Sequence, residues 1–282
     1  MIFSVIVPFL NEEVYIERCI RSLLTQDFNR SEYELIFVDN SSTDRSIEIA
    51  RRFPEVILLS ENKRCSYAAL NKGLMAAKGR IIAFTDADCA VSKDWLNRIY
   101  DGMYRVGATI VLGKCSFPEG SSGFLHFFED YENAKVEYVL NRCCREYFFG
   151  YTRNMAVRAE VFKRFGNFIE TPILADTEFI QRCVLCDPNI KVAYLNDMCV
   201  THMEITNIKS WLNKIYNYGG HSKHKAMPYY QPLNYRIKLS ICTQCIKENN
   251  YRFIEKIMFL FLLMAGDISY KVGRVKRYMI KL

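Results

Sequence analysis

The chain has 282 residues, of which 50% are hydrophobic and 24% charged, and it contains no stretch of low complexity. This composition excludes an intrinsically disordered or fibrous protein, and the length is sufficient for one large domain or for a domain with an appended subdomain. The formal charge of +7 is uneven, because residues 201–282 carry 14 Lys and Arg against 4 Asp and Glu, whereas the preceding residues are weakly acidic. Such a tail is typical of a segment that meets phospholipid headgroups or nucleic acid, although a merely solvated basic face has the same composition.

The sequence also indicates a compartment. Residues Met1 to Pro8 lack the charged segment with which a signal peptide begins. The longest apolar run, Ile257 to Ala265, is about half of the roughly 20 residues that span a bilayer. Eleven cysteines are an odd number in a chain without an export signal, so we expect reduced thiols and a cytoplasmic protein. Two Cys-x-x-Cys pairs leave zinc open, but the 55 residues between them favour buried, apolar cysteines.

Short apolar runs alternate with amphipathic stretches in the first 115 residues. The runs are rich in β-branched or aromatic residues and predict buried strands at residues 3–7, 34–38, 56–59, 81–85 and 109–112. Apolar residues at helical spacing predict helices between them, at residues 16–24, 46–53, 68–78 and 93–104. This alternation is typical of an α/β protein whose mostly parallel sheet is flanked by helices.

The remainder of the chain is more helical. We expect a helical, aromatic segment at 121–145, and then a loop from residue 150 that leads into a short helix at 160–165. Next we expect a helix at 176–186, one or more strands at 192–203, and a helix at 210–225. The last thirty or so residues have the pattern of one or two amphipathic helices.

Polar clusters follow three of the predicted strands. They are Asn11-Glu12-Glu13, the run from Asp39 to Asp44, and Asp86-Ala87-Asp88. In a sheet of this kind the ligand binds beyond the carboxyl ends of the strands, so we expect the clusters to converge. Two carboxylates one residue apart suit Mg²⁺ or Mn²⁺ bound to a diphosphate, although aspartate also caps turns at strand ends.

The clusters carry a family resemblance. Val5 to Glu12, Phe37 to Asp44 and Asp86-Ala87-Asp88 occur in the order and spacing of family 2 of the inverting glycosyltransferases, which the chain resembles over residues 1–225. The resemblance implies the GT-A fold and a nucleoside diphosphate sugar as donor, with UDP expected. It implies sugar transfer to a hydroxyl of a glycan, a lipid-linked glycan or a polysaccharide precursor.

The resemblance also implies which residues bind the donor. Asp39 would hydrogen-bond the uracil ring, and Asp86 would face the ribose or the sugar. The other residues assigned to the nucleotide-sugar site are Pro8, Asn11, Glu12 and Asn71. From the residues alone, the run after the second strand could instead be a turn that caps the next helix.

Metal binding and catalysis are implied for three further residues. Asp88 would hold Mg²⁺ or Mn²⁺, with His202 as a second metal ligand. Asp176 would be the general base that takes the proton of the acceptor hydroxyl. The residues alone leave open that Asp176 is a helix N-cap and that His202 is structural.

The chain departs from the family pattern at three positions. Cys65 and Leu70 stand where the family commonly has Gly and Arg, and Ala175 stands where an acidic residue precedes the base. These departures leave open a catalytically silent protein that binds a nucleotide sugar or associates with a membrane. A nucleotidyltransferase is the enzymatic alternative, but no glycine-rich phosphate loop follows the first strand. Cations that could replace the missing arginine are Lys63, Arg64 and Lys72.

We therefore predict a catalytic domain at 1–225, with a nucleotide-sugar half at 1–115 and an acceptor-side half at 116–225, and a helical, basic extension at 226–282. The apolar run in this extension precedes five cations, Lys271, Arg274, Lys276, Arg277 and Lys281. An amphipathic helix of this kind binds anionic lipid in the plane of a membrane, so peripheral attachment to the inner membrane face is one interpretation. Packing on the catalytic domain is the other, and we expect no nucleic-acid partner.

Overall fold

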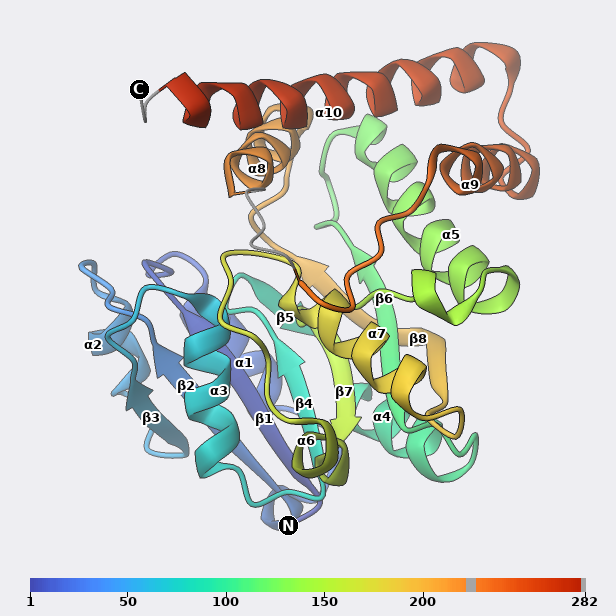
Figure 1. Cartoon of the computed structure of the whole chain (residues 1–282). Coiled ribbons are helices and arrows are strands. Elements are labelled where there is room, and N and C mark those ends of the chain that lie inside the picture. Colours follow the sequence, from blue (N-terminus) through green and yellow to red (C-terminus); the bar gives the residue numbers. More distant parts are fainter. Residues whose placement is uncertain (222–226, 280–282) are drawn as a thin grey trace.

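The computed structural model describes residues 1–221 and 227–279, within which eight strands form one sheet between helices (Figure 1). The strand order is β3-β2-β1-β4-β7-β6-β8-β5. The strands are β1 (Phe3–Phe9), β2 (Tyr33–Asp39), β3 (Val56–Ser60), β4 (Ile81–Thr85), β5 (Cys89–Val91), β6 (Ile110–Ser116), β7 (Asn154–Arg158) and β8 (Val192–His202). The α/β class and the five strands predicted in the first part of the chain are confirmed.

The part of the sheet formed by β3, β2, β1 and β4 is parallel throughout. Val5, Ile6 and Val7 of β1 are fully buried because helices cover both faces. One face is covered by α1 (Ile16–Leu24), α2 (Ser46–Ala50) and α4 (Trp95–Tyr104), and the other by α3 (Ser66–Ala76), α6 (Ala159–Phe165) and α7 (Ala175–Cys186). Burial on both sides requires continuous apolar runs, which is why the sequence alone revealed these strands.

Two strands were missed by the sequence analysis. β7 occupies part of the segment predicted as a loop, and it pairs antiparallel with β4 and with β6. Its apolar run, Met155 to Val157, is too short to be distinctive, so its strand conformation depends on partners on both sides. β5 has three residues and pairs antiparallel with β8.

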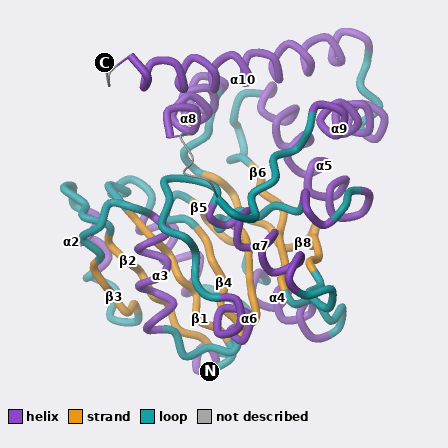
Figure 2. The backbone as a smooth tube through the Cα atoms, in the orientation of Figure 1, coloured by secondary structure: helices purple, strands orange, loops and turns teal. Residues whose placement is uncertain are grey.

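The remaining helices are α5 (His126–Arg142), which packs against β6 and β8, α8 (Ile208–His221), α9 (Tyr235–Glu248) and α10 (Phe253–Met279), and short 3₁₀ turns occur at Arg30–Glu32, Gly123–Leu125 and Arg145–Tyr147. The helix predicted at 210–225 is confirmed through its described part, since residues 222–225 lie outside the described ranges. α9 lies within the helical extension predicted at 226–282, although its own bounds were not predicted, and the last segment forms one helix over its described residues. In Figure 2 the strands form an inner layer, and loops at one end of it lie between the sheet and α8.

α10 packs along α8 through direct backbone contact. A Cβ atom at Gly219 would lie 2.0 Å from the carbonyl oxygen of Tyr270, and one at Gly273 would lie 2.0 Å from that of Tyr216. Only glycine allows so close an approach. Of the helices in residues 1–221 and 227–279, none is long and apolar enough to cross a membrane.

Candidate active site

A cavity of about 910 Å³ opens at the carboxyl ends of β1 and β4 and extends to α5, α8 and α9. A volume of this size is typical of a ligand-binding site. Six of the nine site residues predicted from the sequence line it, namely Pro8, Glu12, Asp86, Asp88, Asp176 and His202. The convergence of strand-end clusters that the sequence predicted therefore brings the proposed metal ligands and the proposed base to one cavity.

The other three predicted residues do not line the cavity and instead fix the backbone around it. The Asp39 carboxylate accepts hydrogen bonds from the backbone N–H groups of Ser41 and Ser42, at 3.2 and 3.0 Å. Asn11 has a left-handed backbone (φ 58°), and its Oδ1 accepts a 2.7 Å hydrogen bond from the Thr43 N–H. Asn11 thus links the loop after β1 to the loop after β2, and Asp39 orders the loop after β2. Their predicted contacts with the donor stay predictions.

Asn71 of α3 is bonded to a distant loop. Its Nδ2 donates to the Phe168 carbonyl at 2.9 Å, and its Oδ1 accepts from the Phe168 N–H at 3.2 Å. Both ends of the amide are therefore used to fasten the segment after α6. Its assignment to the nucleotide-sugar site likewise stays a prediction.

A potential metal site lies where β5 meets β8. The register of these strands pairs Cys89 with His202, and one ligand atom from each of Asp88, Cys89 and His202 lies within 4.8 Å of the others. Asp88 Oδ2 is 3.5 Å from His202 Nε2. A carboxylate oxygen and an imidazole nitrogen are suitable ligands for Mn²⁺, so the donor set fits the expected metal. Burial lowers the pKa of His202 to about 3, which keeps the imidazole neutral as metal binding requires.

Two further carboxyl groups crowd beside these ligands. Burial, followed by the charges of Asp88 and Glu204, raises the pKa of Glu12 to about 8. Burial and the neighbouring Asp88 raise the pKa of Asp86 to about 7. A bound cation would relieve this crowding of carboxylates, which is a second reason why the site suits a metal ion.

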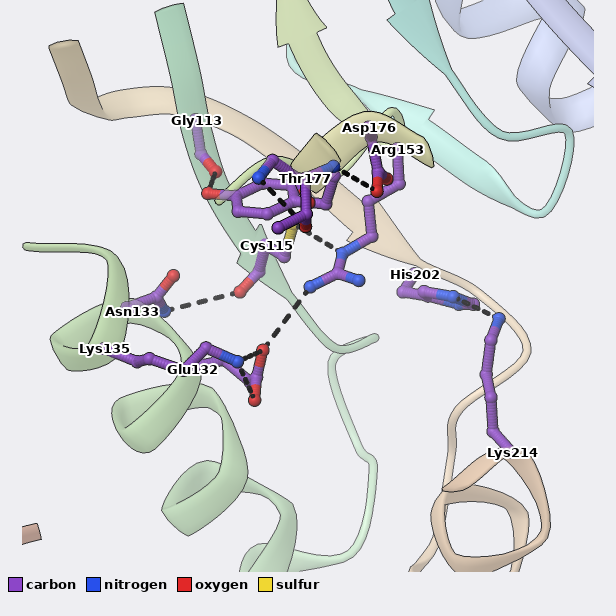
Figure 3. Close-up of polar contacts among 12 residues, drawn as sticks. Gly113, Cys115, Glu132, Asn133, Lys135, Arg153, Asp176, Thr177, His202 and Lys214 are labelled. Atoms are coloured by element: carbon purple, nitrogen blue, oxygen red, sulfur yellow. Dashed lines mark hydrogen bonds and ion pairs between the residues drawn. The ribbon is translucent and has the colours of Figure 1, made fainter. Parts of the chain in front are cut away.

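Lys214 was missed by the sequence analysis, because nothing in the pattern of α8 marks one lysine among several. Its Nζ lies 3.1 Å from Asp88 Oδ2 and 2.6 Å from His202 Nε2, and Figure 3 shows the side chain reaching His202 from α8. The same ammonium is 3.1 Å from Glu204 Oε2. A protein cation thus already lies between the two predicted metal ligands.

Asp176 lies in the first turn of α7 with 8% of its surface exposed. The N-cap of that helix is Leu174, so the alternative of Asp176 as N-cap is wrong. Its carboxylate accepts hydrogen bonds from the N–H groups of Thr177 at 2.8 Å and Thr152 at 3.3 Å. Burial nevertheless raises the pKa of Asp176, although those two bonds and one from the Tyr67 hydroxyl oppose the increase. A buried carboxylate with a raised pKa is suited to general base catalysis.

Beyond Asp176, the cavity is lined by charged and aromatic side chains. Glu132 of α5 pairs with Lys135 at 2.6 Å and with Arg153 at 3.7 Å (Figure 3). The Arg153 guanidinium lies 4.7 Å from the centre of the Tyr151 ring, and the Lys135 ammonium lies 5.2 Å from that of Phe149. The sequence analysis predicted a loop from residue 150 within the acceptor-side half but did not identify the partners that α5 supplies.

With this geometry in place, the chain can be compared with known proteins. The model of the family described as "Glycosyl transferase family 2" matches residues 4–166, which is more than half of the chain. The chain belongs to glycosyl transferase family 2. The resemblance noted from the strand-end motifs is therefore confirmed.

Within this family, a relative in Haloferax volcanii, glycosyltransferase AglE, is 32% identical over 173 residues, which cover 58% of this chain and 55% of AglE. Glycosyltransferase GlyG of Streptococcus pneumoniae is 30% identical over 151 residues, covering 50% of each protein. The matched region thus spans about half the length of these curated relatives.

Two solved structures support the GT-A fold. The mannosyltransferase PcManGT from Pyrobaculum calidifontis, solved with GDP-Man and Mn²⁺, has a TM-score of 0.69 at 19% identity, covering 99% of this chain and 88% of its own. Staphylococcus aureus TarS, solved with UDP-GlcNAc, has a TM-score of 0.59 at 18% identity, covering 96% of this chain and 82% of its own. The predicted GT-A fold is confirmed.

The three departures from the family pattern lie in or near the cavity. Cys65 and Leu70 line it, and the Cys65 thiol contacts the Thr171 carbonyl at 3.4 Å. Of the cations proposed to replace the missing arginine, Arg64 lines the cavity, whereas Lys63 forms an ion pair with Glu170.

Proposed function

We propose that the chain is an inverting glycosyltransferase that transfers a sugar from a nucleoside diphosphate, with UDP the expected nucleotide, to an acceptor hydroxyl. The observation that carries this proposal is that Asp176 lines the same cavity as Asp88 and His202. A transfer with inversion requires a catalytic base and a group of residues that binds the departing diphosphate. PcManGT and TarS, which share the fold, were solved with GDP-Man and UDP-GlcNAc respectively.

The donor would lie against the loops after β1, β2 and β4. Asp88 and His202 would hold Mn²⁺ or Mg²⁺, which when bound neutralises the charge that grows on the departing diphosphate. Oxygen and imidazole ligands, together with the neighbouring carboxyl groups of Glu12 and Asp86, suit either of these divalent cations. Pro8, together with the loops in which Asn11 and Asp39 form their hydrogen bonds, would position the uracil base and the ribose of the donor.

Asp176 would accept the proton in the transfer step. The acceptor oxygen forms its bond to the anomeric carbon on one face, while the bond from that carbon to the diphosphate oxygen breaks on the opposite face. The hydroxyl proton passes to the Asp176 carboxylate as the new bond forms. The hydrogen bonds from Thr152 and Thr177 keep that carboxylate oriented in the apo protein.

The acceptor would be a glycan, a lipid-linked glycan or a polysaccharide precursor. The far end of the cavity combines aromatic rings, such as Phe149 and Tyr151, with the charged group Glu132, Lys135 and Arg153. Rings offer apolar contact to the face of a sugar, and paired charges offer hydrogen bonds to its hydroxyl groups. This combination supports a carbohydrate acceptor.

We further propose that α10 attaches the enzyme to an anionic membrane surface, which in the cell would be the inner membrane face. Phe259 is fully buried against α5, whereas Ile257 and Phe261 are 54% and 64% exposed. The exposed apolar side chains continue along the helix, at Phe253, Ile254, Leu260, Met264, Ile268, Val272 and Val275. Lys271, Arg274 and Lys276 lie on the same helix, while the side chains of Arg277 and Lys281 lie outside the described residues. An unburied apolar stripe with neighbouring cations is suited to anionic lipid.

Release of UDP from a panel of UDP-sugars with Mn²⁺ tests the catalytic proposal. The wild-type protein should release UDP from one donor, and both Asp88→Ala and Asp176→Asn should lose that release. A folded protein that binds UDP but turns over no donor, with or without added acceptors, would instead favour the catalytically silent binding role.

A further inference from the structure

The Lys214 ammonium lies where Asp88 and His202 would bind a divalent ion. The Lys214 ammonium lies 2.6 Å from His202 Nε2 and 3.1 Å from Asp88 Oδ2, and these two atoms are the ones that would bind the divalent ion. Lys214 is partly buried, with 22% of its side chain exposed, whereas the side chains of Asp88 and His202 are buried. The ammonium therefore reaches from a half-buried helix position into a buried pair of ligands.

The chemistry of His202 makes the two occupants mutually exclusive. A neutral imidazole has one nitrogen with a free lone pair, and Nε2 uses that pair to accept the hydrogen bond from Lys214. A metal ion needs the same lone pair at about 2.1 Å. An ammonium held beside a divalent ion would also be repelled, because both are positive and the site is largely shielded from water.

The surroundings offer the ammonium a second position. Glu204 Oε2 lies 3.1 Å from Lys214 Nζ, and the Glu204 side chain is half exposed. A second cavity of about 400 Å³, lined in part by Glu204, Asn213 and Lys214, adjoins the potential metal site of Asp88 and His202. The lysine side chain can therefore move away from Asp88 and His202 without leaving an acidic partner.

We propose that Lys214 is a tethered competitor of the divalent cation. Its ammonium neutralises Asp88 when no metal is bound, and it must move toward Glu204 before Asp88 and His202 can bind a metal ion. The apparent metal affinity is then reduced by the fraction of time that Lys214 spends in the site. This inference rests on the proposed function, in which Asp88 and His202 bind a metal ion. It assigns a role to a residue outside the family motifs.

Mn²⁺ binding to the full-length protein tests the competition directly, with free Mn²⁺ followed by electron paramagnetic resonance and no donor present. Lys214→Met should bind Mn²⁺ at least about tenfold more tightly than wild type, since a competitor that occupies the site nine-tenths of the time lowers affinity by that factor. Lys209→Met, which removes an exposed lysine from the same helix, should leave the affinity unchanged. If Lys214→Met does not fold, Lys214→Gln serves the same purpose.

Glu204 gives a second test of opposite sign. Glu204→Gln removes the alternative partner, so Lys214 should stay longer at Asp88 and Mn²⁺ should bind several-fold more weakly. In the Lys214→Met background most of this loss should disappear, because the two residues act through one interaction. A loss of equal size in both backgrounds would show only a general effect of the Glu204 charge and would contradict the proposal.

Equal or weaker Mn²⁺ binding by Lys214→Met overturns the proposal. Absence of Mn²⁺ binding in wild type and variants also overturns it, since no site would exist for which to compete. UDP release measured on the same proteins with and without EDTA separates these failures from failure of the proposed function. Release that persists in EDTA would leave sugar transfer intact and remove only the metal competition.

Discussion

The two ends of the cavity are built in different ways. The proposed donor end consists of residues that directly follow β1, β2 and β4, and its loops are held by short bonds such as those of Asn11 and Asp39 to the β2–α2 turn. The proposed acceptor end is assembled from side chains of α5, the segment before β7, and α9. The first is set by strand ends that must meet at one edge, whereas the second depends on how separate helices pack. We therefore expect substitutions at the donor end and at the general base, Asp176, to alter the rate of sugar transfer. Substitutions at the acceptor end should alter acceptor binding alone.

The largest expected effect is at the boundary between the two ends. Asp176→Asn preserves the shape of the side chain but removes the proton acceptor, and its single amide oxygen can accept from only one of the N–H groups of Thr152 and Thr177, which bond different carboxylate oxygens in the wild type. We expect kcat for transfer to fall by roughly 10²- to 10⁴-fold, the range for loss of a general base. UDP affinity, measured by calorimetry, should change by less than about twofold, because a base that acts only in the transition state contributes little to ground-state binding.

Asp101→Asn, at a surface position on α4, is the matched control and should retain wild-type kcat. Retention of transfer activity by Asp176→Asn would mean that another group takes the proton. The assignment of Asp176 as the general base would then be wrong.

The next effect concerns α10, which packs on α5 of the acceptor end through Phe259. Replacing Ile257 and Phe261 together by Glu places charge on the exposed stripe of α10 without touching the buried Phe259. Partition onto phosphatidylglycerol vesicles should drop by at least about tenfold, since two apolar contacts are lost and anionic lipid now repels the helix. Met75→Glu changes an even more exposed apolar residue on α3 and should bind the vesicles like wild type. If the wild-type protein does not bind these vesicles, or if the double variant binds them equally well, α10 is not a membrane-binding surface.

The same division explains what could be predicted from the sequence. β1, β2 and β4 are buried on both faces, so their apolar runs and the polar residues after them revealed both the strands and the donor loops. β5 and β7 are short and owe their conformation to pairing with β8, β4 and β6, which no local pattern reports. Lys214 and Glu132 reach the cavity only because α8 and α5 pack at particular angles, so nothing in their neighbourhood of the sequence marked them.

A smaller effect should separate acceptor binding from donor binding. Phe149→Leu keeps an apolar side chain but removes the ring that faces Lys135 and the acceptor end. With any simple nitrophenyl glycoside that wild type accepts, the acceptor KM should rise about tenfold, equivalent to about 1.4 kcal/mol, while the donor KM and the rate of donor hydrolysis stay within about twofold.

Phe124→Leu, at an exposed phenylalanine before α5, is the control for loss of a ring and should change neither constant. An increase of the donor KM in Phe149→Leu would contradict the division, because it would show that the acceptor end also holds the donor.

The smallest effect is a shift in pH dependence. Asp176 must be deprotonated to accept a proton, so activity should fall as the pH drops through its pKa, and burial places that pKa above the ordinary value for aspartate. The Tyr67 hydroxyl donates a hydrogen bond that stabilises the carboxylate and lowers its pKa. Tyr67→Phe removes that bond, so the acidic limb of the kcat profile should move to higher pH, with kcat near its wild-type value on the plateau above it. A limb that stays in place, in a variant with unchanged thermal stability, would show that a group other than Asp176 controls the acidic limb, and the base would have to be sought among the carboxylates of the donor end.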